Sequence, residues 1–220
     1  LLSCRFVPVL GPAEGIYYGI FHAISGFCNA GFDLMGRWEE YSSLCLFRGD
    51  ILVNAVIMGL IVIGGLGFVV WDELLHNKWH WKKYMLHTKM VLTITGILLF
   101  GGAGLFYLFE KNNLFAGMSL KDTVLCSLFA AVTPRTAGFN TVDIAAMSEP
   151  GKLVTILLML IGGSPSSTAG GIKTTSIAVI VLFLLFYIKK EKNIHAFKRN
   201  ISNDLVKKAC TVLLINLSMA

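Results

Sequence analysis

The sequence predicts an all-α, polytopic membrane protein, and three observations lead to this fold class. The 220 residues are 55% hydrophobic and only 15% charged, with a mean hydropathy of +0.69, whereas soluble domains carry about 25% charged residues. Apolar stretches long enough to cross a bilayer recur along the chain. The triplet Ala-Gly-Phe occurs at Ala30–Phe32 and again at Ala137–Phe139, which indicates a repeated unit.

Three apolar stretches account for the predicted membrane crossings. Ile51–Trp71 and Met90–Phe109 are each long enough for one crossing, because about 20 residues at about 1.5 Å rise each span the roughly 30 Å hydrocarbon core. Gly151–Ile188 is too long for one simple span and is interrupted. A fourth apolar run begins near Leu205 and continues to Ala220, so the chain is expected to be part of a longer protein.

Two short segments between these spans predict re-entrant pore loops. Ser119–Val132 predicts a helix of about 21 Å that is too short to cross, and Pro134 ends it before Thr136–Thr141 returns the chain outward. Gly15–Phe27 and Cys28–Asp33 repeat this design at an offset of 107 residues (138 − 31). A single triplet would favour an ordinary turn glycine, but two matched copies favour repeated helix–pore-loop–helix units around a central ion pore.

The geometry of such a pore loop favours a cation. A pore helix that enters from outside points its C-terminus, with about half a negative charge, at the membrane centre. The extended return presents successive carbonyls inward only where a residue leaves the ordinary β region, which glycine does at little cost. Backbone carbonyls of this kind can replace the hydration shell of an ion. Gly31 and Gly138 are therefore the principal candidate filter residues.

The third apolar stretch is interrupted by the Gly-, Ser- and Thr-rich residues Gly162–Gly171. No regular helix is expected there, because glycine costs about 1 kcal/mol and proline about 3 kcal/mol in a helix interior. Lys173 follows, roughly 24 Å along the helix from Lys189, and is expected to face the conduction path because a lysine in lipid costs at least about 2.5 kcal/mol. A Walker A loop is disfavoured, since Ile172 separates the lysine from the last glycine.

Basic residues predict the topology and exclude other classes of function. They concentrate in Asp72–Lys89 and after Ile188, so the positive-inside rule places both connections in the cytosol. Their sorting into alternate connections disfavours a nucleic-acid surface. The cysteines and histidines show no metal-ligand spacing, and neither covalent chemistry nor a covalently bound cofactor is expected.

Three motifs resemble those of one known family. They are SGFCNAGFDL (Ser25–Leu34), TPRTAGFNT (Thr133–Thr141) and GGSPSSTAGGIKTTS (Gly162–Ser176). Together they resemble the Ktr branch of the Ktr/Trk/HKT potassium transporters, and within it a KtrB-like membrane (pore) subunit, in which four repeats surround one pore. The resemblance implies the pore loop and second helix of repeat two in residues 1–71, a complete repeat three in 90–188 and the start of repeat four in 205–220, with cytosolic connections at 72–89 and 189–204.

The resemblance also implies the functional residues. The implied filter carbonyls are those of Asn29, Ala30, Gly31 and Phe32 and of Thr136, Ala137, Gly138 and Phe139. The implied gate is an intramembrane loop comprising Gly162, Gly163, Ser164, Pro165, Ser166, Ser167, Thr168, Ala169, Gly170, Gly171 and Lys173.

The implied ligands and partners follow from the same resemblance. K⁺ is the transported ion, and Na⁺ is a coupling ion in some members. The chain is expected to work in the plasma membrane, in contact with the lipid bilayer, with a cytosolic ring of nucleotide-binding subunits and as a homodimer.

Two charged residues near the filter leave alternatives open. Arg135 is expected to pair with a buried carboxylate, for which Glu14 and Asp143 are candidates, or with pore-helix carbonyls. Asp33 either attracts cations at the outer mouth or is an exposed loop acid.

Two alternative functions fit the sequence less well than ion conduction. A secondary transporter that binds an organic substrate at the broken helix is disfavoured, because such proteins need paired broken helices and the sequence indicates one. A structural membrane anchor would not need two filter-like loops.

Overall fold

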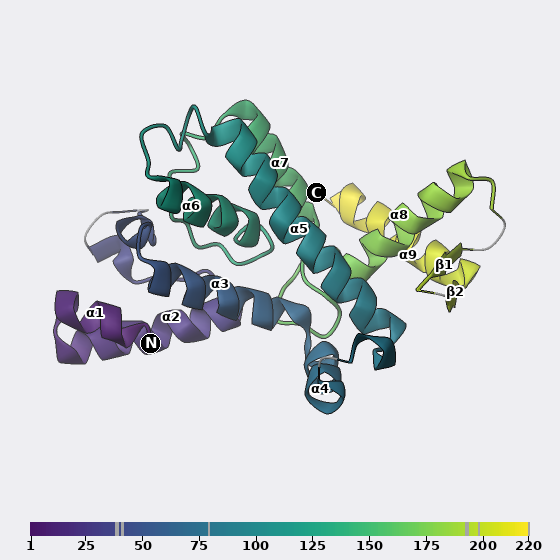
Figure 1. The fold of residues 1–220 in the computed structure, drawn as a ribbon, viewed down its shortest axis with the longest axis horizontal. Helices are drawn as coiled ribbons and strands as arrows, with labels where there is room; N and C mark the ends of the chain where they lie inside the picture. Colours follow the sequence, from purple (N-terminus) through teal and green to yellow (C-terminus); the bar gives the residue numbers. More distant parts are fainter. Residues whose placement is uncertain (38–39, 41, 79, 192–193, 198, 220) are drawn as a thin grey trace.

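The computed structural model describes residues 1–37, 40, 42–78, 80–191, 194–197 and 199–219, and helices form most of it (Figure 1). The α-helices are α1 (Ser3–Leu10), α2 (Pro12–Phe27), α3 (Ile51–Leu66), α4 (Phe68–Asn77), α5 (Leu86–Glu110), α6 (Leu120–Val132), α7 (Glu149–Leu160), α8 (Thr174–Ile188) and α9 (Asn203–Met219). Short 3₁₀ helices η1 (Met35–Arg37), η2 (Cys45–Phe47) and η3 (Trp81–Lys83) and strands β1 (Ile194–Ala196) and β2 (Arg199–Ile201) complete the description.

Two helical groups lie on either side of the long helix α5 (Figure 1). On one side α1 pairs with α2, α2 packs on α3, and α6 contacts both α3 and α5. On the other side α8 packs on α5 and on α9. The short pore helices α2 and α6 therefore lie in the same half of the molecule, beside α3.

The apolar stretch at residues 90–109, predicted as a crossing, lies within the single helix α5. This helix has 25 residues and is long and apolar enough to cross a membrane on its own. Much of its apolar surface faces outward: Ile97, Phe100 and Leu108 are 60%, 75% and 60% exposed. Such a surface suits contact with lipid or with further membrane helices.

The apolar run at residues 51–71, predicted as one crossing, does not form one continuous helix. Helix α3 ends at Leu66, α4 begins at Phe68, and the two helices are bent by 97° at the break. Gly67, between them, has φ +90°, and a Cβ built there would lie 2.5 Å from the Pro165 carbonyl oxygen. The chain turns because a distant loop packs against the end of α3, a contact that the apolar run does not reveal.

The predicted break in the third apolar stretch is confirmed. Helix α7 ends at Leu160 and α8 begins at Thr174. The intervening loop folds back on itself, since Gly162 N donates to Ile172 O (3.0 Å) and Thr174 N donates to Gly163 O (3.1 Å). We refer to residues 162–173 as the intramembrane loop.

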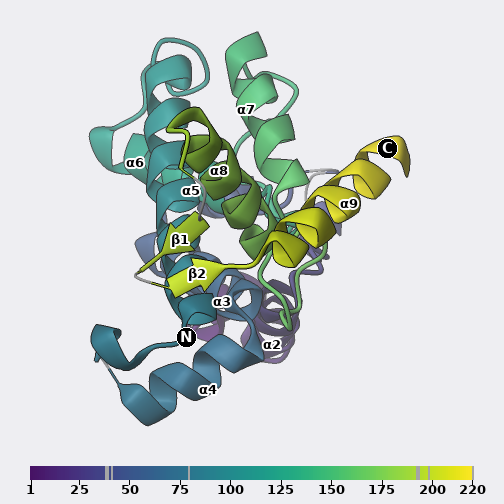
Figure 2. The same ribbon diagram turned by 90° about the vertical axis from the view of Figure 1, so that its right-hand side faces the viewer.

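A small hairpin departs from the otherwise helical fold. Strands β1 and β2 pair antiparallel with Ile194 opposite Ile201, inside the second predicted cytosolic connection. Figure 2 shows the hairpin beside α8 and α9, and its inward side chains join their apolar cluster with Ala178 and Val206. The sequence did not predict strands here, because three-residue strands leave almost no alternating pattern.

Candidate functional site

The two predicted pore helices are both present, and the second begins as predicted. Ser119 caps α6, its hydroxyl accepting a hydrogen bond from Asp122 N (3.1 Å). Helix α2 begins at Pro12, three residues before the predicted start at Gly15. Each helix is followed by an extended return, which we call the first filter loop (residues 28–33) and the second filter loop (residues 136–141).

The two filter loops repeat one backbone conformation. Asn29 and Gly31 have φ of +50° and +71°, and Thr136 and Gly138, each 107 residues later, have φ of +66° and +88°. The left-handed backbone predicted at both glycines is confirmed. The same conformation at Asn29 and Thr136 was not predicted, and it is uncommon for a β-branched residue such as threonine.

The conformation of Asn29 has a local cause. Asn29 N donates to Gly26 O (3.2 Å) and Ala30 N donates to Ser25 O (3.0 Å), which is the Schellman pattern that closes a helix through one left-handed residue. Asparagine is among the few residues that tolerate this position. The Asn just beyond the end of α2 was therefore a sequence signal for the exact start of the return.

The two filter glycines lie against each other. A Cβ built on Gly31 would overlap Ala137 O and lie 2.9 Å from Gly138 Cα, and one built on Gly138 would lie 3.2 Å from Gly31 Cα. Backbone thus meets backbone between loops from different repeats. Side chains at either position would push the two loops apart.

Hydroxyl groups at the ends of the pore helices hold the returns in place. Ser25 Oγ donates to Phe32 O (2.7 Å), and Thr133 Oγ1 donates to Phe139 O. The carbonyls at residues 29–31 and 136–138 accept no hydrogen bond from any residue that the structure describes, whereas Asn140 O accepts from Leu44 N (2.8 Å). Ala30 and Gly138 are exposed, and unpaired carbonyls of this kind can serve as ion ligands.

The two phenylalanines differ in their surroundings. Phe139 is fully buried and lies beside the ring of His22, whereas Phe32 is 70% exposed. The exposed ring of Phe32 is therefore open to contact with groups beyond those described.

The intramembrane loop touches both filter loops. Thr168 Oγ1 accepts from Asn29 Nδ2 (2.8 Å) and donates to Phe27 O (2.9 Å). Gly170 N donates to Thr136 Oγ1 (3.2 Å). The structure thus brings the predicted gate and the predicted filter together at Asn29 and Thr136, the two equivalent left-handed residues.

The same loop caps the broken end of α3. Ser164 N donates to Gly65 O (3.0 Å), Ser164 Oγ donates to Leu66 O, and Thr168 N donates to Gly64 O (3.2 Å). A helix end leaves four carbonyls without partners in the helix, and the loop satisfies these three. The first residue of α4 joins the arrangement, since Phe68 N donates to Ser166 O (2.9 Å).

Lys173 lies at the end of the intramembrane loop as the residue preceding α8. Its ammonium donates to Ala169 O at 2.8 Å and is partly buried. The positive charge is therefore held against the loop backbone, within the region that contacts the filter.

The expected carboxylate partners of Arg135 are wrong. Glu14 pairs with Arg37 on the outer surface (2.9 Å), and Asp143 Oδ1 accepts from Ala145 N (2.9 Å). Arg135 is buried and its Nη2 lies 3.5 Å from Thr95 Oγ1 on α5, a weak hydrogen bond. The sequence suggested a buried carboxylate or pore-helix carbonyls as partners, whereas the guanidinium instead reaches Thr95 on α5.

The outer acids mostly have local partners. Asp33 Oδ1 accepts from Met35 N (2.9 Å), which closes the turn after the first filter loop. Hydrogen bonds from Arg37 to Glu14 raise the pKa of the exposed Arg37 guanidinium. Asp33 is thus partly engaged in shaping the outer mouth.

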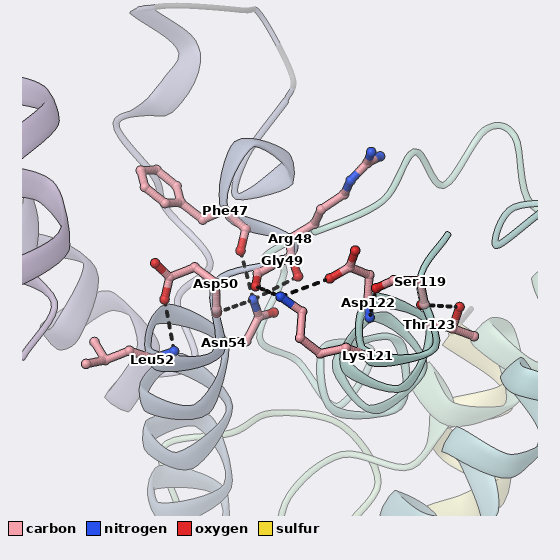
Figure 3. Close-up of polar contacts among 10 residues, drawn as sticks. All are labelled: Phe47, Arg48, Gly49, Asp50, Leu52, Asn54, Ser119, Lys121, Asp122 and Thr123. Carbon is pink, nitrogen blue, oxygen red and sulfur yellow. Dashed lines mark hydrogen bonds and ion pairs between the residues drawn. The ribbon is translucent and has the colours of Figure 1, made fainter. Parts of the chain in front are cut away.

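The outer ends of α3 and α6 are joined by polar contacts (Figure 3). Asp50 caps α3 by accepting from Leu52 N (2.9 Å) and Val53 N (3.1 Å). Lys121 Nζ, on α6, donates to Gly49 O (2.9 Å) and lies 3.5 Å from Asp122 Oδ1. This junction sets the position of the second pore helix relative to the first repeat, and so the position of one filter loop relative to the other.

Comparison with known proteins agrees with this geometry. The family model described as TrkH, cation transport protein, matches residues 8–218. The chain is 40% identical over 219 residues to the potassium/sodium uptake protein NtpJ of Enterococcus hirae, covering 99% of this chain and 47% of that protein. It is 38% identical over 221 residues to the Ktr system potassium uptake protein B of Bacillus subtilis, covering 99% and 48%.

A solved structure shares the fold. The crystal structure of the potassium transporter TrkH from Vibrio parahaemolyticus superposes with a TM-score of 0.69 at 19% identity, covering 96% of this chain and 45% of that one. The chain thus spans about half the length of the relatives it matches. On the family match, the identities and the two filter loops, this chain belongs to the TrkH family of cation transport proteins.

Proposed function

We propose that the full-length protein takes up K⁺ across the plasma membrane through a filter and a gate to which this chain contributes two filter loops and the gate. The observation that carries the proposal is the pair of matched loops whose carbonyls at residues 29–31 and 136–138 accept no hydrogen bond within the described residues. Their glycines lie against each other, which places the two loops side by side. The names of the relatives, which are potassium uptake proteins, support K⁺ as the ion.

Each predicted site residue has a role in this proposal. The backbones of Asn29–Phe32 and Thr136–Phe139 bind the ion as it loses its water. Residues 162–171 form the gate beneath them, and the ammonium of Lys173 opposes cation passage while the loop lies across the pore.

The partners are proposed on the resemblance and on the names of the relatives. One relative is named protein B of a Ktr system, which supports work with a separate subunit. That this subunit is a cytosolic nucleotide-binding ring is proposed on the resemblance alone. Another is named a potassium/sodium uptake protein, which supports Na⁺ as a coupling ion. A homodimer in the bacterial cell membrane completes the proposal.

The break between α3 and α4 bears on the alternative function. It shows that two helices are interrupted, so the argument that a secondary transporter would need a second broken helix no longer excludes that class. The pore loops still favour conduction, since their carbonyls at residues 29–31 and 136–138 accept no hydrogen bond within the described residues. The cavity lined by Gly65, Arg135 and Gly163 beside the break holds only about 10 Å³, too small for an organic substrate.

The filter assignment is tested by Gly138→Ser in the full-length protein. We expect weaker K⁺ over Na⁺ discrimination, because serine at φ +88° costs about 1–2 kcal/mol and its Cβ would lie 3.2 Å from Gly31 Cα. The measurement is growth of a K⁺-uptake-deficient bacterium at low K⁺, with ion uptake measured in the same cells.

Gly104→Ser is the matched control, because Gly104 lies in α5 with no atom within 4 Å of a built Cβ. Discrimination should stay at the wild-type level in this variant. Unchanged K⁺ over Na⁺ discrimination in Gly138→Ser would rule out the second filter loop as part of the filter.

A further inference from the structure

We propose that the side chains of Asn29 and Thr136 hold the intramembrane loop closed, so that the filter and the gate form one hydrogen-bonded unit. The inference rests on the proposed function and adds positioning residues to it. Asn29 and Thr136 would then each have two roles: the backbone carbonyl faces the ion, and the side chain holds the gate.

The first contact is made by Asn29. Its side chain is buried and its Nδ2 donates to Thr168 Oγ1 (2.8 Å), while the same hydroxyl donates to Phe27 O (2.9 Å). Helix α3 closes this contact from behind, since a Cβ built on Gly64 would overlap Phe27 O and lie 2.8 Å from Thr168 Oγ1. Thr168 is therefore enclosed by the first filter loop, the end of α2 and α3.

The second contact is made by the equivalent residue of the other repeat. Thr136 Oγ1 accepts from Gly170 N (3.2 Å), and a Cβ built on Gly170 would have Thr136 Cγ2 as its nearest atom, at 3.9 Å. Thr168 and Gly170 are two residues apart, so the two repeats bind the same short piece of the loop. Both bonds come from the filter residues with a left-handed backbone.

The loop is held differently at its other end. Residues 164–166 bind the main chain of α3 and α4 through Gly65, Leu66 and Phe68, and these contacts leave the filter untouched. Residues 168–170 bind the side chains of Asn29 and Thr136 in the filter loops, in addition to the bond from Thr168 N to Gly64 O of α3. Opening of the gate therefore breaks the contacts at 168–170 and releases Asn29 and Thr136, which couples the shape of the filter to the state of the gate. Such coupling is reciprocal, so ion occupancy of the filter would also bias the gate.

Thr168→Val and Thr136→Val test the two contacts in the full-length protein. Valine keeps the branched shape and removes the hydroxyl. One neutral hydrogen bond shifts an equilibrium by about two- to tenfold. Thr136→Val, which loses one bond, should therefore raise resting Rb⁺ uptake by about that factor, and Thr168→Val, which loses two, by at least that factor. The double variant should exceed either. Thr168→Val should retain K⁺ over Na⁺ discrimination, since Thr168 is outside the filter.

Thr155→Val on α7 is the matched control. Its hydroxyl bonds Gly151 O of its own helix (3.0 Å), so resting uptake should equal that of the wild type. Uptake in Thr168→Val at or below the wild-type rate, with equal protein in the membrane, would overturn the inference. A wild-type protein without K⁺ uptake would instead overturn the proposed function.

A disulfide tests the contact even if the valine variants fold poorly. In a protein whose cysteines, including Cys4, Cys28, Cys45, Cys126 and Cys210, are replaced by alanine, the pair Thr136→Cys and Gly170→Cys should crosslink. A Cβ built on Gly170 would lie 3.9 Å from Thr136 Cγ2, and the Cβ atoms of a disulfide lie about 3.5–4.5 Å apart. Oxidation should stop uptake, and a reductant should restore it to a rate above that of the parent. No crosslink by mass spectrometry, or a full crosslink with uptake unchanged, would contradict the inference.

Discussion

A histidine behind the filter shows how one residue serves two loops. His22 on α2 is fully buried; its Nδ1 lies 2.7 Å from Tyr18 O, and Leu34 N donates to its Nε2 (3.3 Å). This pattern requires the neutral tautomer with the proton on Nδ1. Its ring also lies 6.2 Å from that of Phe139. His22 therefore fixes the chain after the first filter loop and supports the second.

Replacement of His22 by phenylalanine should keep the packing but lose the acceptor for Leu34 N. An unpaired backbone donor costs about 1–3 kcal/mol, so we expect lower thermal stability and weaker K⁺ over Na⁺ discrimination in the full-length protein. His76→Phe is the control, because His76 is 76% exposed on α4. Discrimination equal to the wild type in His22→Phe would show that the ring alone supports the filter.

At the scale of elements, the junction of α3, α4 and the intramembrane loop explains why glycines cluster near residue 65. Gly64, Gly65 and Gly67 lie within four positions, yet their surroundings differ. A Cβ on Gly64 would overlap Phe27 O, and one on Gly67 would lie 2.5 Å from Pro165 O at φ +90°. Gly65 has no atom within 4 Å of a built Cβ.

An alanine series should separate these three glycines. Gly64→Ala and Gly67→Ala should each destabilise the full-length protein by about 2 kcal/mol or more, through overlap with backbone and, at Gly67, through left-handed strain. Gly65→Ala should be neutral or slightly stabilising, because alanine favours the helix by about 1 kcal/mol. Thermal unfolding in detergent measures all three. Equal stability of Gly65→Ala and Gly67→Ala would contradict the assigned break.

At the scale of the whole molecule, the exposed ends of the long helices predict its orientation. Lys111 follows α5 at the end near the pore-helix starts, and Lys190 follows α8 at the opposite end, near the β-hairpin. Both side chains are exposed. The positive-inside rule places Lys190 in the cytosol and Lys111 outside.

Cysteine labelling checks this orientation. In the cysteine-free protein, Lys111→Cys should react with a membrane-impermeant maleimide in intact cells. Lys190→Cys should react only after the membrane is permeabilised. The reverse pattern would invert the topology, and with it the assignment of the intramembrane loop to the cytosolic side of the filter.

The sequence predicted features that are set by neighbouring residues and missed features that are set by residues far away along the chain. The span at α5, the Ser119 cap and the left-handed backbone of Gly31 and Gly138 depend on local composition, propensity and spacing. The bend at Gly67 depends on Ser164, which is 98 residues away from Leu66 along the chain. One glycine in an apolar run destabilises a helix by only about 1 kcal/mol, so a glycine alone does not predict that the helix ends there.

The candidate site shows the same limit. The motifs identified the candidate filter and gate residues. Which of these residues contact one another is known only from the structure. Arg135 illustrates the point, because its approach to Thr95 depends on how α6 packs on α5.

The capping of α3 by the intramembrane loop also constrains the order of biosynthesis. Helix α3 leaves the ribosome well before residues 164–168, which satisfy its last carbonyls. Until they arrive, the end of α3 at membrane depth has unpaired backbone groups, which lipid does not solvate. The repeat in residues 1–71 therefore completes its fold only after the repeat in residues 90–188 has been inserted. The two repeats then fold as a single cooperative unit.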